Sequence, residues 1–180
     1  GKNQIPEDCT SQNWGITYDE LEPYYDQFEH IYGVGGKAGN LNGEIQPGGN
    51  PFEGPRSREF PNPPTTQTFA ESLFAKTAES FGYKPFPSAT AAMTRPYTNS
   101  YRLNLAQCVR GGFCSPFGCA MGAKATPLTT VLPALYKHKN FELRPLANVI
   151  KVNLDSEKKR AVSVTYLDAR GHEVEQPAEL

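Results

Sequence analysis

The sequence predicts an α+β fold in which an irregular segment of helices and loops is followed by an antiparallel β-meander. Two observations support this prediction. Up to about residue 140, apolar residues recur at helical spacing only in short stretches, separated by loops rich in glycine and proline. From Phe141 onward the hydrophobic period changes to two, as in half-buried strands joined by tight turns. With 180 residues, the chain is long enough to bury a core.

The first helix is expected to contain an interruption. Thr17 and Glu20 have the spacing of a capping box, in which a hydroxyl and a carboxylate each bind a backbone N–H at the helix start. Pro23 follows three residues later, and proline is poorly tolerated inside a helix. We therefore expect one short turn at residues 18–21 and a helix that restarts at Pro23 and ends near Tyr32.

Two further helices are expected before residue 140. Residues 68–71 form a second capping box, after which a helix runs to Phe81 and ends at a left-handed Gly82. The two threonines at 129–130 can cap a short third helix over residues 131–137, because threonine is a good N-cap residue.

Residues 34–66 are expected to form a long irregular loop, since proline, glycine and asparagine recur throughout. A loop of this length inside a compact domain is uncommon and is usually functional or packed on a partner surface. Three apolar residues in the loop argue for packing: Ile45, Phe52 and Phe60. Arg56 and Arg58 could bind an anion, although a solvated position is the more usual state of arginine.

Four strand candidates follow residue 140 and show the alternation of half-buried strands. They comprise residues 141–144, 148–154, 162–166 and 174–176. The Asp-Ala-Arg-Gly sequence at residues 168–171 is typical of a hairpin turn between the last two strands.

Charge and hydropathy exclude some classes of function. The chain carries 18 basic and 19 acidic residues without a basic run, so no nucleic-acid partner is indicated. No apolar run approaches the roughly 20 residues that a membrane helix needs. The start lacks the charged and apolar regions of a signal peptide, and the end directly follows a strand-like pattern. We therefore expect the chain to be an excised piece of a longer protein.

Three cysteines lie close together in a glycine-containing loop at residues 107–120: Cys108, Cys114 and Cys119. A looping backbone can turn three sulfurs toward one point, and gathered thiolates bind zinc, copper(I) or an iron–sulfur cluster. A structural zinc site normally needs four ligands, whereas three suit a cluster with three protein-bound irons. A disulfide between two of the cysteines, or simple packing, are the alternatives. Cys9 is distant in sequence and is expected to pack.

An ordered set of stretches carries a family resemblance: residues 16–25 (ITYDELEPYY), 129–135 (TTVLPAL), 141–143 (FEL) with 148–149 (NV), and 161–166 (AVSVTY). Together they resemble the glucose–methanol–choline (GMC) flavoprotein oxidoreductases. The long loop at 34–66 and the cysteine loop are similar to the bacterial branch that contains the large subunits of gluconate, fructose, sorbitol and FAD-dependent glucose dehydrogenases.

This resemblance implies a division of the chain into two parts. Residues 1–140 would belong to the substrate domain, and residues 141–180 would form a β-meander of the FAD-binding domain. A valine in the strand that matches residues 148–150 contacts the adenine of FAD in this family through its backbone, which points to Val149. The family's glycine loop and catalytic acid–base pair match nothing in the chain. We therefore expect no catalytic residue in it, and the isolated piece should be inactive.

The resemblance also implies an electron relay. In these dehydrogenases, cysteines of the matching loop hold a [3Fe-4S] cluster between the flavin and a cytochrome c subunit, and Cys108, Cys114 and Cys119 match them. The parent enzyme would oxidise a hydroxyl group of a sugar, sugar acid or polyol by proton removal and hydride transfer to FAD. Its expected partners are the cytochrome c subunit and a small subunit, and its expected location is the periplasm, membrane-associated through a partner. The alternative is a non-enzymatic binding module stapled by a metal or a disulfide.

Overall fold

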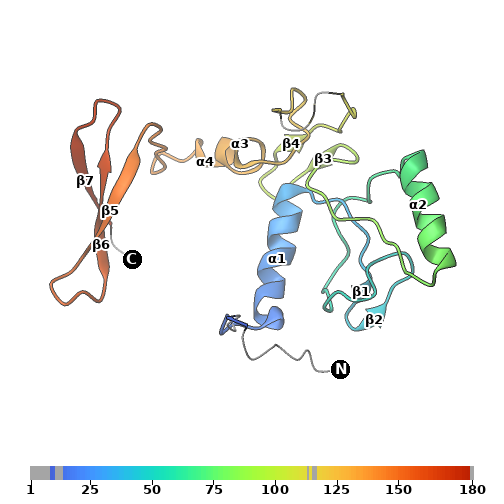
Figure 1. Cartoon of the computed structure of the whole chain (residues 1–180). Helices are drawn as coiled ribbons and strands as arrows, with labels where there is room; N and C mark the ends of the chain where they lie inside the picture. Colours follow the sequence, from blue (N-terminus) through green and yellow to red (C-terminus); the bar gives the residue numbers. More distant parts are fainter. Residues whose placement is uncertain (1–8, 11–13, 113, 115–116, 179–180) are drawn as a thin grey trace. The chain divides into compact units, whose positions relative to one another are not determined.

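The computed structural model describes residues 9–10, 14–112, 114 and 117–178. The chain divides into two compact units, one up to Lys137 and one from His138, and each is described here by itself (Figure 1). The first unit contains helices, loops and two short hairpins, and the second contains a three-stranded antiparallel sheet. The expected α+β class is confirmed.

Helix α1 spans Tyr18–Tyr32 without interruption. The expected capping box is present, because the Glu20 N–H donates to Thr17 Oγ1 at 3.3 Å and the Thr17 N–H donates to the Glu20 carboxylate at 2.7 Å. Gly33 ends the helix in the left-handed conformation at φ +62°. The expected break at Pro23 is wrong: the helix continues through the proline, whose missing N–H deprives only one carbonyl of a partner.

Ion pairs and a hydrogen bond between α1 and the long loop explain why α1 tolerates this proline. Three acidic residues on one face of α1 bind consecutive residues of the long loop: Glu29 binds Arg56, Glu22 binds Ser57, and Asp26 binds Arg58. The Arg56 side chain is only 10% exposed, and its guanidinium carbon lies 3.8 Å from the centre of the Phe60 ring. The expectation of a solvated Arg56 is therefore wrong, because paired acceptors and an aromatic face replace water around its charge.

The remainder of the long loop contains one hairpin, formed by strands β1 (Asn40–Leu41) and β2 (Glu44–Ile45). Its two turn residues, Asn42 and Gly43, both have positive φ, at 52° and 92°. Ile45 and Phe52 are 59% and 83% exposed, so neither is packed within this unit, and packing of the loop on a partner surface stays a prediction.

The core of the first unit is small. Among the described residues, its buried hydrophobic cluster consists of Met93, Leu105 and Ala123. Leu105 reaches this cluster from strand β4 (Asn104–Leu105), which pairs antiparallel with β3 (Tyr97–Thr98). Buried Asn62 and Asn99 also connect distant segments: Asn99 Nδ2 donates to the carbonyls of Ile31 and Thr130 at 3.0 and 2.9 Å.

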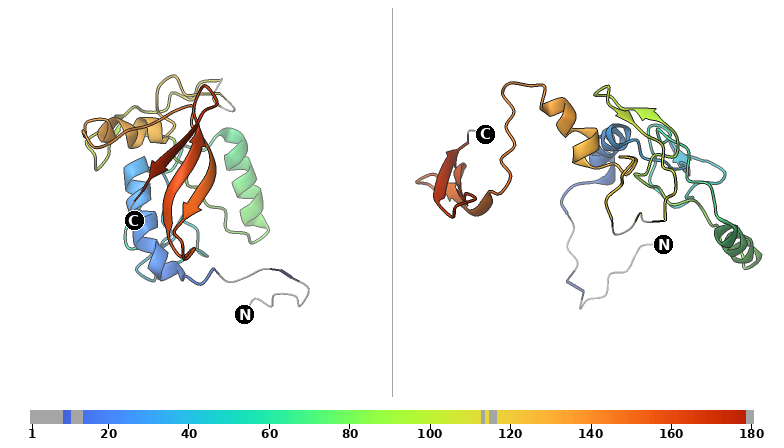
Figure 2. Two further views of the ribbon diagram at one scale, coloured as in Figure 1. Left: turned by 90° about the vertical axis from the view of Figure 1, so that its left-hand side faces the viewer. Right: turned by 90° about the horizontal axis from the view of Figure 1, so that it is seen from above.

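Helix α2 spans Phe69–Ser80 and begins at the expected capping box, in which the Thr68 N–H donates to Glu71. Gly82 has the expected positive φ of 81°. Figures 1 and 2 show α2 at the edge of the unit, apart from α1, and none of its residues is buried.

The expected third helix is replaced by two single turns, α3 (Pro127–Thr130) and α4 (Leu132–Leu135). Helix α3 begins earlier than expected, because Pro127 occupies a first-turn position, where proline is favoured. Val131 separates the two turns, because its φ of −127° is not helical although its ψ of −53° is.

The second unit is the expected meander, with strands β5 (Asn148–Leu154), β6 (Ala161–Leu167) and β7 (Glu173–Pro177) in the order β5–β6–β7 (Figure 2). Asp168 and Gly171 form the expected turn, with Gly171 at φ +82°. The expected strand at residues 141–144 is absent, and Arg144 there binds Glu142 at 2.6 Å instead of entering the sheet. Of the described helices, none has the length and apolar character needed to cross a membrane.

Candidate functional site

The two ends of the cysteine loop are held by one segment of the core. The Met93 N–H donates to the Ala123 carbonyl, and the Cys108 N–H donates to the Met93 carbonyl, both at 2.9 Å. The Ala125 N–H donates to the Ala91 carbonyl at 2.8 Å. Residues 91–93 therefore lie between the segment that enters the loop and the segment that leaves it, and fix the separation of the two.

The structure brings the three predicted cysteines to one cavity of about 230 Å³, whose lining includes Cys108, Cys114 and Cys119. Cys108 and Cys119 are half-buried and pack against the core cluster, whereas Cys114 is exposed. Cys9 does not line this cavity, and because it is exposed the expectation that it packs is wrong. Phe113, Ser115 and Pro116 of the predicted loop lie outside the described residues.

Backbone donors favour the charged form of one thiol. The N–H of Lys124 lowers the pKa of Cys119, and the N–H groups of Ala123, Met121 and Gly122 make smaller contributions in the same direction. Desolvation of the thiol raises its pKa and so reduces this effect in part, but the net shift is downward. A thiolate is the form that binds metals, so these donors prepare Cys119 for ligation. At the other end of the loop, the Arg110 N–H donates to Cys108 Sγ at 3.3 Å.

Two cationic side chains lie beside the same loop. Arg110 Nη2 donates to the Thr66 carbonyl at 2.7 Å, and Lys124 Nζ donates to the Cys114 carbonyl at 3.2 Å. Their side-chain donors thus bind backbone oxygens of the loop and of the segment beside it.

The three cysteine sulfurs, with backbone N–H groups that favour the Cys119 thiolate, form a donor set that fits a soft metal or an iron–sulfur cluster. The sulfurs do not form a finished coordination shell, since no group of three or more His, Cys, Asp or Glu side chains in the described part of the chain is arranged to hold a metal ion. All four cysteines are free of disulfides. The fit therefore lies in the chemistry of the donors.

Val149, the predicted FAD contact, lies in β5 opposite Tyr166 and is 55% exposed. It lines a cavity of about 400 Å³ at one end of the sheet. Arg144 Nη1 crosses this end and donates to Gln176 Oε1 at 2.6 Å and to the Tyr166 hydroxyl at 3.4 Å. The register shifts between Val149 and Lys151, as in a β-bulge, a feature that redirects backbone groups next to binding sites. The adenine contact itself stays a prediction.

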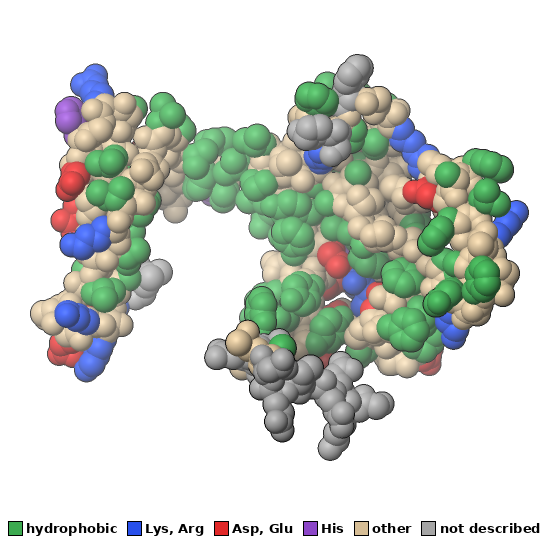
Figure 3. Space-filling model, viewed as in Figure 1, with side chains coloured by type: hydrophobic (Ala, Val, Ile, Leu, Met, Phe, Trp, Pro, Cys, Tyr) green, Lys and Arg blue, Asp and Glu red, His purple; other side chains and the backbone are tan. Residues whose placement is uncertain are grey.

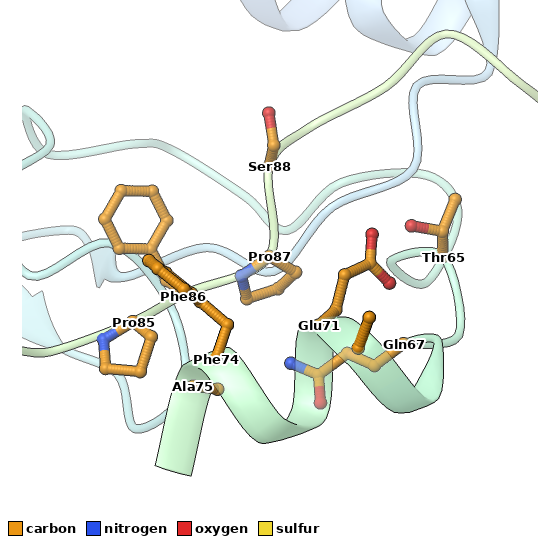
Figure 4. Close-up of a pocket in the computed structure, with 10 residues that line it drawn as sticks. Thr65, Gln67, Glu71, Phe74, Ala75, Pro85, Phe86, Pro87 and Ser88 are labelled. Carbon is orange, nitrogen blue, oxygen red and sulfur yellow. The ribbon is translucent and has the colours of Figure 1, made fainter. Parts of the chain in front are cut away.

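A larger cavity, of about 540 Å³, lies between α2 and the segment that follows it, and the sequence did not predict it (Figure 4). Phe74 of α2 and Phe86 form one side of it, and Figure 4 shows Glu71 and Pro87 facing each other across it. Glu71 accepts the N–H of Thr68 at 2.6 Å, a bond that lowers its pKa. Glu71 is the one titratable residue in the cavity lining, so the cavity offers no acid–base pair.

The sequence of this chain is similar to those of known flavoprotein oxidoreductases. Residues 10–179 match the family model described as GMC oxidoreductase. The whole chain is 45% identical to the gluconate 2-dehydrogenase flavoprotein of Pantoea cypripedii, covering 30% of that protein. It is 33% identical to paromamine 6'-oxidase of Streptomyces fradiae over 88% of the chain and 25% of that protein, and 26% identical to the fructose dehydrogenase large subunit of Gluconobacter japonicus over 87% and 26%. The chain thus spans about a third or less of these relatives.

Proposed function

Because the chain belongs to the GMC oxidoreductase family, we propose that it is part of an FAD-dependent dehydrogenase that oxidises a CH–OH group of a sugar acid. The observation that carries this proposal is the 45% identity to a gluconate 2-dehydrogenase flavoprotein along the entire chain. Gluconate is therefore the first substrate to test, with related sugars and polyols after it.

The exposed surface of the chain supports its place in a larger protein. Large apolar side chains of the sheet are exposed, among them Val149, Val152 and Val162 at 42–56% exposure. Exposed apolar surface on this scale marks contact with other protein. We assign residues 1–140 to the substrate domain and residues 141–180 to the FAD-binding domain.

Within this proposal, the second unit helps to hold the cofactor. Val149 would present its backbone to the adenine of FAD, and the register shift beside it is of the kind that redirects backbone groups next to binding sites. Arg144 stabilises the end of the sheet through Glu142 and Gln176, which fixes the position of the segment before Val149. FAD, when bound, accepts the hydride from the substrate carbon.

The cysteine loop supplies the second cofactor in this proposal. Cys108, Cys114 and Cys119 would hold a [3Fe-4S] cluster, which supplies one-electron transfer out of the flavin. The partners would be a cytochrome c subunit and a small subunit, in a periplasmic complex attached to the membrane through a partner. The fructose dehydrogenase relative is named as a large subunit, which supports the presence of partner subunits.

The test uses the complete flavoprotein that contains this chain. We expect released FAD on denaturation and gluconate-dependent reduction of a small redox dye. We also expect an oxidised-state EPR signal that is lost in Cys114→Ser and retained in Cys9→Ser, because Cys9 does not line the cavity. Absence of flavin and of sugar-acid oxidation would refute the dehydrogenase. Full dye activity with titratable thiols at Cys108, Cys114 and Cys119 and no EPR signal would refute the cluster alone.

A further inference from the structure

The total charge of the chain is nearly neutral, but basic and acidic residues are unevenly distributed along the sequence. Residues 80–141 contain seven Lys or Arg and no Asp or Glu. The other residues carry 11 Lys or Arg against 19 Asp or Glu. The positive segment includes the entire cysteine loop and the segments that hold it, so the cysteine cavity lies in the cationic part of the protein.

These cations are not neutralised within the described part of the chain. The ion pairs found there all involve residues outside 80–141, such as Arg56 with Glu29 and Arg58 with Asp26. The Thr68 N–H has the largest effect in lowering the pKa of Glu71, and the charge of Arg110 adds a smaller one, although Arg110 and Glu71 form no ion pair. Glu71 thus offsets part of the Arg110 charge, whereas Lys124 forms no ion pair in the described part of the chain. Positive charge beside the cysteines therefore stays available to an external anion.

Exposed apolar side chains occur in the same loop. Val109 and Met121, which line the cavity, are 66% and 49% exposed, and Phe117, which precedes the lining residue Gly118 in sequence, is 58% exposed. Two cations border them: Arg110, which is exposed and lines the cavity, and Lys124, which is half-buried and reaches the Cys114 carbonyl. Figure 3 shows Lys and Arg side chains on this part of the unit, between the cysteine loop and the hydrophobic side chains of α2. An apolar centre with a charged rim is the usual anatomy of a protein-docking surface.

We propose that the cysteine-loop surface, defined as Val109, Arg110, Phe117, Met121 and Lys124, docks an electron-accepting protein whose own docking face is acidic. This inference rests on the proposed function, in which electrons leave through the cysteine loop. Charge complementarity selects the occupant, because a basic acceptor would be repelled by Arg110 and Lys124 and an acidic one would be attracted and oriented. An electron-transfer contact needs only a small interface.

Ionic strength provides the first test, with the complete flavoprotein purified without its cytochrome subunit, gluconate as substrate, and two purified c-type cytochromes as probes, one acidic and one basic. Raising the salt from about 0.01 to 1 M shortens the screening length from roughly 30 to 3 Å. We expect reduction of the acidic cytochrome to slow on the order of tenfold, within the range known for electrostatic steering. A neutral dye, measured in parallel, reports gluconate oxidation without docking, so rates are expressed as the ratio of cytochrome to dye reduction.

Variants then locate the effect. Arg110→Gln with Lys124→Gln removes both rim charges and should lower the ratio for the acidic cytochrome several-fold at low salt, with little change at 1 M. The conservative Arg110→Lys should retain most of the ratio. Lys158→Gln, in the exposed turn between β5 and β6, is the matched control.

The outcomes separate the two proposals. Faster reduction of the basic cytochrome, a ratio that salt leaves unchanged, or an equal response to Lys158→Gln would overturn the acidic-partner inference while dye reduction still supports the dehydrogenase. Failure of the wild-type enzyme to reduce the dye with any sugar acid would overturn the proposed function, and the docking inference with it.

Discussion

Met93 connects the fold to the cysteine loop, and its truncation should weaken both. The side chain is fully buried and packs with Leu105 and Ala123, while its backbone binds both ends of the loop. Met93→Ala keeps these backbone hydrogen bonds and removes the thioether that Cys108 and Cys119 pack against. We therefore expect a loss of stability together with a looser cysteine cavity.

The size of the effect follows from complete burial. Truncating a buried methionine to alanine costs about 2–5 kcal/mol, depending on how far the cavity collapses. With few buried neighbours available to fill the space, we expect about 3 kcal/mol, or roughly 6–12 °C in the melting temperature of a cooperative unit of this size. The chain offers a matched control, because Met121 is 49% exposed and Met121→Ala should cost no more than about 0.5 kcal/mol.

Thermal denaturation and thiol mapping measure the two consequences. After removal of any metal with a chelator, labelling followed by mass spectrometry should show faster modification of Cys108 and Cys119 in Met93→Ala. Met93→Leu conserves volume and should lie within about 1.5 kcal/mol of the wild type. If Met93→Ala and Met121→Ala melt and label alike, the assignment of Met93 as the support of the cysteine loop is wrong.

Three further predictions concern individual charges. Arg56→Gln leaves a nearly buried carboxylate at Glu29 without its cation and should cost about 2–4 kcal/mol in thermal unfolding; the additional change Glu29→Gln should restore part of this, and no restoration would contradict the pairing. The pKa of Cys119 lies below the ordinary thiol value of 9.0, so alkylation by iodoacetamide of the metal-free protein should reach half its plateau below pH 9, and a midpoint at or above this value would exclude the backbone effect. The hydrogen bond from Arg58 lowers the pKa of Asp26, so this pair stabilises the fold at neutral pH and its contribution is lost as the pH falls below about 4. Arg58→Gln should flatten the acid limb of the stability profile, and an unchanged limb would argue against the pair.

Local sequence signals predicted where α1 and α2 begin, but not the start of α3 or the unbroken course of α1. Both capping boxes formed as expected, because their hydrogen bonds join residues three positions apart. The break at Pro23 did not form, since the cost of proline is offset by acidic residues of α1 that bind a loop about 30 residues later. The hairpin at Asn42 and Gly43 could have been predicted, because Asn-Gly is a strong signal for a two-residue turn.

Long-range polar contacts could not be predicted in the same way. Arg56 looked like a solvated residue because nothing near it in sequence could pair with it, and Glu29 is 27 residues away. Asn62 and Asn99 gave no signal of burial either, since asparagine is usually exposed. Only the folded chain shows that their amides satisfy carbonyls of distant segments.

At the cysteine loop, some features of the candidate site could be predicted from the sequence and others could not. Spacing and glycine content predicted that three sulfurs would meet, and they do line one cavity. The lowered pKa of Cys119 depends instead on the direction of four backbone N–H groups, which is a property of the folded turn. The surrounding positive charge was visible in the sequence but disappeared when charges were summed over the whole chain. Because electrostatic steering acts over roughly 10 Å at moderate salt, the charge of the segment around a site, not that of the entire chain, determines which partner it attracts.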